Sequence, residues 1–231
     1  MTQHIGIAGC SAEGAALCYK TICLEGQAVL GQHVHPEISM HTPPLSDYVD
    51  CLDKDDVAGI GELMLQSAIK LAAIGADFVV CPDNTVHQAF DSMIDRSPLP
   101  WLHIGEVVAA EAARRKFQRL AITGTSWLVA SDVYPAKLAN YGLGFARPNQ
   151  DECKEIDRII MEELTMGIFK PDAIASFQHV INRMATDGCD AVILGCTEIP
   201  LIMDDKNSSL PTLDSTRLLA RAALERATSD S

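Results

Sequence analysis

Positive charge is scarce in this sequence. The 231 residues hold 18 lysines and arginines against 31 aspartates and glutamates, which gives a formal net charge of −13. Binding to a nucleic-acid backbone needs clustered Lys and Arg side chains that neutralise phosphates. The composition therefore argues against nucleic-acid binding, although a protein with an acidic surface can still bind a small anion in a pocket.

Long apolar runs and paired cysteines are missing as well. No stretch approaches the ~20 apolar residues that a membrane helix needs. The first residues, "MTQHIGIAGC", enter an apolar strand with no basic segment before it, and the eight cysteines form no CxxC pair. These absences predict no membrane segment, no signal peptide and no disulfide framework. We expect a cytoplasmic protein with reduced thiols.

Metal-binding and phosphate-binding motifs are also lacking. The two histidines of "HVH" at 33–35 have no cysteine or carboxylate set at ligand spacing,. The stretch "GIAGCSAEG" has neither the GxGxxG spacing nor the GK[ST] ending of a nucleotide-binding loop,. We therefore expect neither a metal nor a nucleotide cofactor.

Apolar runs instead alternate with helical patterns along the whole chain. The helical patterns include 61–75 and 173–188. Alternation of this kind, with continuous apolar strands, predicts an α/β fold whose parallel sheet is covered on both faces. The predicted strands are residues 4–9, 37–42, 77–81, 101–104, 119–123, 143–147 and 190–195.

The chain also repeats itself. The segment "GADFVVCPDNT" (75–85) aligns without gaps with "GCDAVILGCTE" (188–198), an offset of 113 residues (188 − 75). The segment "IGIAGCS" (5–11) aligns with "LAITGTS" (120–126), an offset of 115 (120 − 5). We interpret these matches as two similar α/β halves.

A boundary between the halves is predicted at "SPLPW" (97–101), where two prolines interrupt helix and strand,. The predicted domains are residues 1–98 plus 212–231, and residues 99–211. The helical pattern at 215–227 is expected to pack back on the first half.

The repeat pairs Asp83 with Cys196 at the ends of equivalent strands. Ligands of open parallel sheets bind at the carboxyl ends of the strands, so two facing halves would place both positions beside one ligand. Cys196 follows a strand and precedes a turn or helix, where backbone N–H groups favour a thiolate. Cys81 lies inside its strand and is predicted to be a buried apolar thiol.

Two proton-transfer groups on opposite sides of a small ligand are what racemisation of a carbon acid requires. One group takes the α-proton from one face, and the other delivers a proton to the opposite face. Polar side chains nearby could hold the substrate carboxylate and stabilise the enolate-like intermediate. The candidate substrate-binding residues are Ser11, Thr42, Asn84, Thr85, Thr125, Thr197, Glu198 and Lys170.

The turns "PDNTVH" and "GCTEIPLI" resemble the two signature turns of the aspartate/glutamate racemase family. The resemblance covers most of the chain and includes "IGIAGCSAEGAALCYKTI", "TGTSWLVASDVY", "EELTMGIFKPDA" and "LPTLDSTRLLARAAL". It implies two pseudo-symmetric flavodoxin-like domains with the active site in the cleft between them. It also implies amino-acid racemisation without pyridoxal phosphate or metal, a small amino-acid or carboxylic-acid substrate, and often a homodimer.

The sequence departs from the family pattern at Asp83, where most members carry the first of two catalytic cysteines. We predict a mixed pair of bases, Asp83 and Cys196. Cys196 acting alone, as in the similar arylmalonate decarboxylases, is an alternative. A maleate-isomerase-like enzyme and a non-catalytic protein that binds an amino or dicarboxylic acid are two others.

The sequence also departs from the family pattern at residues that select the substrate. Relatives that act on aspartate or glutamate usually have an arginine after the second strand, but "MHTPPLSDYVDCLDK" (40–54) has none. His41 and Lys170 are the candidates to take its place, and Trp127 with Leu128 indicates a larger or more apolar pocket. His87, three residues after Asn84, is expected to provide a supporting hydrogen bond.

Overall fold

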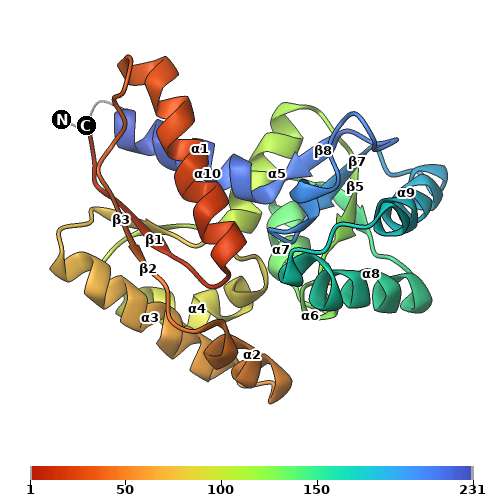
Figure 1. Cartoon of the computed structure of the whole chain (residues 1–231), viewed down its shortest axis with the longest axis horizontal. Coiled ribbons are helices and arrows are strands. Elements are labelled where there is room, and N and C mark those ends of the chain that lie inside the picture. Colours follow the sequence, from red (N-terminus) through yellow and green to blue (C-terminus); the bar gives the residue numbers. More distant parts are fainter. Residues whose placement is uncertain (1, 230–231) are drawn as a thin grey trace. The chain divides into compact units, whose positions relative to one another are not determined.

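The computed structural model describes residues 2–229, which divide into two compact units (Figure 1). Unit 1 extends to Ile104 and includes the chain from Thr216 onward, and unit 2 is Gly105–Ser215. The bounds differ by a few residues from the domains predicted at 1–98 plus 212–231 and at 99–211. That division into domains stays a prediction.

Unit 1 is built on a four-stranded parallel sheet in the order β2-β1-β3-β4. The strands are β1 (Ile5–Ala8), β2 (Ile38–His41), β3 (Phe78–Val80) and β4 (Trp101–Leu102). Strands β1 and β3 are buried along their whole length, because helices cover both faces of the sheet. Such two-sided burial explains why these strands read as continuous apolar runs.

The helices of unit 1 begin at side chains that cap them. Ser11 accepts a hydrogen bond from the Gly14 N–H, and Asp56 accepts one from the Gly59 N–H. These bonds satisfy backbone donors that a helix start leaves without partners. The helices are α1 (Ala12–Leu30), α2 (Leu45–Asp53), α3 (Val57–Ala73), α4 (Phe90–Met93) and, from the end of the chain, α10 (Ser215–Thr228).

Helix α10 packs in unit 1, as the sequence predicts. The Gln3 N–H donates to the Ala227 carbonyl oxygen at 3.0 Å. The Arg226 guanidinium lies 4.6 Å from the centre of the Phe78 ring, within the range of a cation–π contact,. The last helix therefore belongs to the same core as the first strands.

Unit 2 repeats this architecture with a parallel sheet in the order β6-β5-β7-β8. Its strands are β5 (Arg119–Thr123), β6 (Gly144–Ala146), β7 (Ala191–Leu194) and β8 (Thr212–Asp214). A large part of its core lies between the sheet and two helices, with Ile160, Phe177 and Val192 among the buried side chains. The helices are α5 (Ile104–Arg114), α6 (Ser126–Ala130), α7 (Val133–Asn140), α8 (Gln150–Glu162) and α9 (Pro171–Thr186).

The pairing register of the strands confirms the repeat read from the sequence. Ile5 of β1 pairs with Phe78 of β3, and Leu120 of β5 pairs with Ala191 of β7. The two pairs are related by the sequence offsets, 115 (120 − 5) and 113 (191 − 78). Residues that follow β3 and β7 therefore occupy equivalent positions in their own units.

All seven predicted strands are present, and the predicted α/β class is confirmed. Strand β8, in "LPTLDS", was not predicted because only three residues pair and only Leu213 of them is buried.

Within residues 2–229 no helix is both long enough and apolar enough to cross a membrane. The same residues contain no group of three or more His, Cys, Asp or Glu side chains that could hold a metal ion.

Candidate active site

The chain leaves β3 through a turn that Asp83 organises. Its Oδ1 accepts hydrogen bonds from the backbone N–H of Thr85 at 3.0 Å and of Val86 at 3.5 Å. An Asp side chain that bonds the backbone two residues on is an Asx turn, and here it starts the 3₁₀ helix Thr85–Ala89,. We call Cys81–His87 the Asp83 turn. Its half-buried carboxylate is held in a fixed direction.

The His87 side chain stabilises this turn. Its side chain is buried, Nδ1 lies 2.8 Å from the Asp83 carbonyl oxygen, and Nε2 lies 3.4 Å from the backbone nitrogen of Ile104. A carbonyl only accepts and an N–H only donates, so Nδ1 carries the proton and Nε2 accepts. The supporting hydrogen bond predicted for His87 is confirmed.

Replacing His87 with phenylalanine should lower the free energy of unfolding. Phenylalanine keeps an aromatic ring at this position but has no ring nitrogens. The change leaves the buried Asp83 carbonyl and Ile104 N–H without this partner, which costs about 1–3 kcal/mol in the free energy of unfolding. Urea denaturation measures the loss. The exposed His179→Ala serves as control and should change stability by less than about 0.5 kcal/mol,. A His87→Phe protein as stable as the wild type would show that these bonds contribute nothing.

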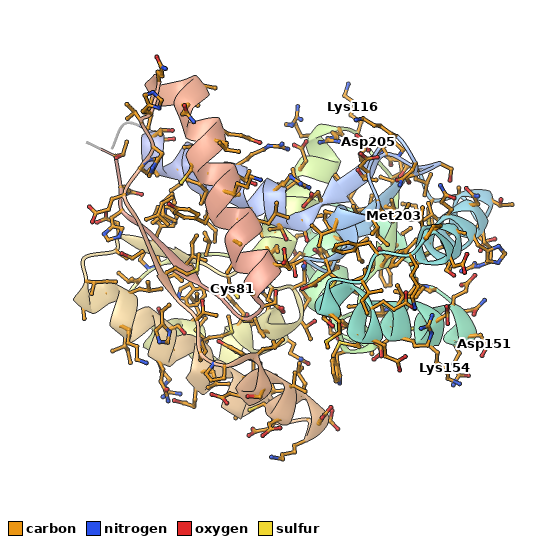
Figure 2. All side chains as sticks on the ribbon, in the orientation of Figure 1. Cys81, Lys116, Asp151, Lys154, Met203 and Asp205 are labelled. Atoms are coloured by element: carbon orange, nitrogen blue, oxygen red, sulfur yellow. The ribbon has the colours of Figure 1, made fainter. Side chains whose placement is uncertain are left out.

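Two buried thiols lie together at the start of the Asp83 turn, Cys81 of the turn itself and Cys10. Cys81, labelled in Figure 2, is fully buried. Its Sγ lies 3.8 Å from Cys10 Sγ and 3.9 Å from the Asp83 carbonyl oxygen. Burial, followed by the neighbouring Cys81, raises the pKa of the Cys10 thiol well above its usual range. Cys10 is therefore a neutral thiol at neutral pH, and the prediction of a buried Cys81 is confirmed.

Other predicted residues of unit 1 gather at the same carboxyl edge. Ser11 caps α1 directly after β1, and Asn84 and Thr85 are buried in the Asp83 turn. The exposed Thr42 lies over Gly9: a Cβ at Gly9 would come within 2.7 Å of Thr42 Oγ1. Glycine at position 9 thus lets the segment after β2 approach the end of β1.

In unit 2, β7 ends in a second turn, Gly195–Glu198, which we call the Cys196 turn. The half-buried Cys196 Sγ donates to Glu198 Oε2 at 2.9 Å, and Thr197 Oγ1 donates to the same oxygen at 2.7 Å. Glu198 is 3% exposed. The buried Glu198 carboxylate therefore lies at hydrogen-bond distance from the cysteine thiol.

The Cys196 turn packs closely against the end of β5. Gly195 donates its N–H to the Thr123 carbonyl at 2.9 Å, and a Cβ at Gly195 would lie 2.5 Å from that oxygen. Thr125, two residues after the end of β5, caps α6, where its Oγ1 accepts from the Leu128 N–H at 3.4 Å. Thr125, Cys196, Thr197 and Glu198 are thus held at the carboxyl edge of the second sheet.

The predicted cationic residues have other contacts. Lys170 is exposed, and its Nζ lies 3.3 Å from Glu163 Oε1. Arg158 binds the same oxygen at 2.8 Å, and Arg158 first and Lys170 second lower the pKa of the Glu163 carboxyl. A direct role of Lys170 in binding substrate stays a prediction.

His41 cannot easily replace the missing arginine. Its Nε2 accepts a hydrogen bond from Lys70 Nζ at 2.9 Å, and its Nδ1 lies 3.0 Å from Ser67 Oγ. Partial burial, and then the Lys70 charge, lower the pKa of the His41 imidazole. His41 is therefore neutral at neutral pH and offers no positive charge to a carboxylate.

Residues 7–223 match the Asp/Glu/Hydantoin racemase family. The chain is 23% identical over 194 residues to the broad specificity amino-acid racemase RacX of Bacillus subtilis (strain 168), a match that covers 82% of this chain and 81% of the relative. A candidate Asp/Glu racemase from Yersinia pestis has a similar structure, with 27% identity, a TM-score of 0.89, and coverage of 97% and 99% of the two chains.

An aspartate racemase homologue from Pyrococcus horikoshii OT3 is 26% identical, with a TM-score of 0.85 and coverage of 99% of this chain and 100% of that one. The family match spans nearly all of both units, including the Asp83 turn and the Cys196 turn. The chain therefore belongs to the Asp/Glu/Hydantoin racemase family.

Proposed function

We propose that the protein racemises a free amino acid by moving its α-proton between two bases, Asp83 and Cys196. As a member of its family, the protein is a racemase of the type that works without pyridoxal phosphate. The observation that carries the proposal is the equivalence of the two turns. Asp83 and Cys196 follow strands that pair in equivalent registers in the two units.

In the proposed reaction the Cys196 thiol first gives its proton to Glu198. The thiolate then takes the α-proton from one face of the substrate, and the electron pair of the broken C–H bond delocalises into the substrate carboxylate. Asp83, protonated on Oδ2, delivers a proton to the opposite face, and exchange with solvent restores both groups. Oδ1 meanwhile keeps its bonds to the Asp83 turn.

The polar residues around the two turns are proposed to hold the substrate. Backbone and side-chain donors aimed at a developing enediolate stabilise it more than the starting carboxylate. Asn84 and Thr197 support this role because both are buried beside a proposed base. The further proposed substrate-binding residues are Ser11, Thr42, Thr85, Thr125, Glu198 and Lys170.

We further propose that the protein forms a homodimer and lies in the cytoplasm. The irregular spacing of the cysteines, with no CxxC pair, supports a reducing compartment, and the family resemblance supports the dimer,.

Glu198→Gln separates proton transfer from substrate binding. Glutamine keeps the size and one acceptor oxygen of the side chain but cannot take up the thiol proton. We expect kcat to fall about 10²-fold with KM nearly unchanged, measured by chiral chromatography, while the exposed Glu225→Gln leaves kcat unchanged. An altered KM at full kcat would assign Glu198 to substrate binding instead.

A panel of single amino-acid enantiomers tests the proposed function. The panel includes acidic, polar and apolar side chains, and chiral chromatography follows the appearance of the opposite enantiomer. We expect at least one amino acid to racemise without added cofactor, and complete stability of all of them would overturn the proposal.

One observation favours a second function. Oδ1 of Asp83 is engaged as a helix-starting acceptor, as expected if Asp83 were structural and Cys196 acted alone. That arrangement suits a decarboxylase that protonates a carbanion from one face. Release of carbon dioxide from an arylmalonate, without amino-acid racemisation, would identify it.

A further inference from the structure

His103 lies directly after β4, at the carboxyl end of the first sheet. Strand β4 pairs with β3 in parallel, and Val80 is opposite Leu102. The next residues along the two strands are Cys81, which begins the Asp83 turn, and His103. Because the carboxyl ends of neighbouring parallel strands meet at one edge of a sheet, His103 lies beside the Asp83 turn.

Aromatic contacts hold the His103 ring against this turn. Its centre lies 4.8 Å from the centre of the His87 ring, and the two ring planes meet at 64°. The Phe90 ring is equally close, at 4.8 Å and 71°. Edge-to-face contacts at these distances are favourable. Since His87 donates to the Asp83 carbonyl, its contact with His103 connects the His103 ring to the proposed active site.

Basic side chains are scarce at this edge of the sheet. Two histidines, and no lysine or arginine, occur in the segments that follow the four strands of unit 1, residues 9–13, 42–46, 81–87 and 103–104. His87 is buried, and both of its ring nitrogens form hydrogen bonds. His103 is half-buried, so solvent reaches part of the residue. His103 is therefore the remaining basic residue of these segments for a dissolved ligand.

A substrate carboxylate at this edge needs a positive partner. It would lie near the Asp83 carboxylate, and two negative charges at one site repel each other. His41, at the end of β2, is neutral and accepts a hydrogen bond from Lys70. An imidazole can take up a proton near neutral pH, and the N–H group of the charged ring forms a strong hydrogen bond with a carboxylate.

We propose that His103 binds the α-carboxylate of the amino-acid substrate beside the Asp83 turn. The same N–H group stabilises the additional negative charge that the carboxylate gains when the α-proton leaves. This inference rests on the proposed function, because it requires an amino acid bound beside the Asp83 turn.

His103→Phe tests the inference because it removes both ring nitrogens and keeps an aromatic ring against His87 and Phe90. Titration calorimetry compares glutamate, serine and leucine, each as both enantiomers, with their α-amides, which lack the α-carboxylate charge. We expect the wild type to bind at least one amino acid about tenfold more tightly than its α-amide, the scale of one hydrogen bond to a charged group. In His103→Phe this preference should fall to within about twofold, with binding of the amide unchanged.

Two further variants complete the comparison. His103→Gln removes the charge but keeps a neutral N–H donor, and its preference for the carboxylate should also be well below that of the wild type. The exposed His179→Phe is the control and should keep the wild-type preference. Thermal unfolding confirms that each variant is folded under the conditions of the titration. The amino group of an α-amide is less basic, but this difference is the same in the wild type and the variants.

Three results would overturn the inference: no preference for the carboxylate in the wild type, an unchanged preference in the two His103 variants, or an equal loss for amino acid and amide. The last would mean that His103 shapes the site without binding the carboxylate. Because binding and not turnover is measured, a wild type that binds these amino acids without racemising them would refute the proposed function and leave the His103 inference standing. Racemisation by the wild type together with an unchanged preference in His103→Phe would do the reverse.

Discussion

Cys196→Ser is expected to lower kcat/KM for racemisation about 10³-fold in both directions, within the range for loss of a positioned base. A serine hydroxyl can still donate to Glu198, so the Cys196 turn should remain intact. It is far less acidic than a thiol and cannot supply the same base near neutral pH. Chiral chromatography from each enantiomer separately measures the loss.

Cys189→Ser is the matched control for this change. Cys189 precedes β7, the strand that Cys196 follows, and is a buried structural thiol in the core of unit 2. We expect it to retain kcat/KM within about threefold when folded, since it has no part in proton transfer. If Cys196→Ser keeps wild-type activity, Cys196 is not a base. If Cys81→Ala abolishes activity in a folded protein, the assignment of Asp83 as the other base is wrong.

Asp83→Asn is expected to lower racemisation about 10²- to 10⁴-fold. The asparagine oxygen can still accept from the Thr85 and Val86 N–H groups, so the Asp83 turn is preserved. Only proton transfer is lost. Cys196 should still exchange the α-proton of the enantiomer whose C–H bond faces it, so exchange with solvent persists for one enantiomer while racemisation stops.

Two further variants complete this test. Asp83→Ala removes the turn acceptor as well and should lower Tm in addition to activity, because the Thr85 and Val86 N–H groups lose their acceptor,. Asp83→Cys places a thiol where most of the family has one and should recover part of the two-way activity. Full racemisation by Asp83→Asn would show that Asp83 only shapes the turn.

Much of the fold could be predicted because the strands are buried on both faces. Ile5–Ala8 and Ala191–Leu194 are apolar throughout, and the helices between them are long. The internal repeat even predicted which residues occupy equivalent positions, and the strand registers agree. Strand β8 was missed because its three residues lack a recognisable apolar pattern.

The site was less predictable because its contacts depend on side-chain direction. No pattern in the sequence predicts that Glu198 binds the thiol two residues before it, or that Asp83 directs Oδ1 to the Thr85 N–H.

Deuterium incorporation tests the two-base account most directly. Each enantiomer of an amino acid that racemises is incubated in deuterium oxide, and mass spectrometry after chiral separation follows the α-position at early times. Two bases on opposite faces predict that the newly formed enantiomer carries deuterium while the remaining starting enantiomer is largely undeuterated. Equal deuterium in both enantiomers from the outset would indicate a single base that serves both faces and would contradict the pairing of Asp83 with Cys196.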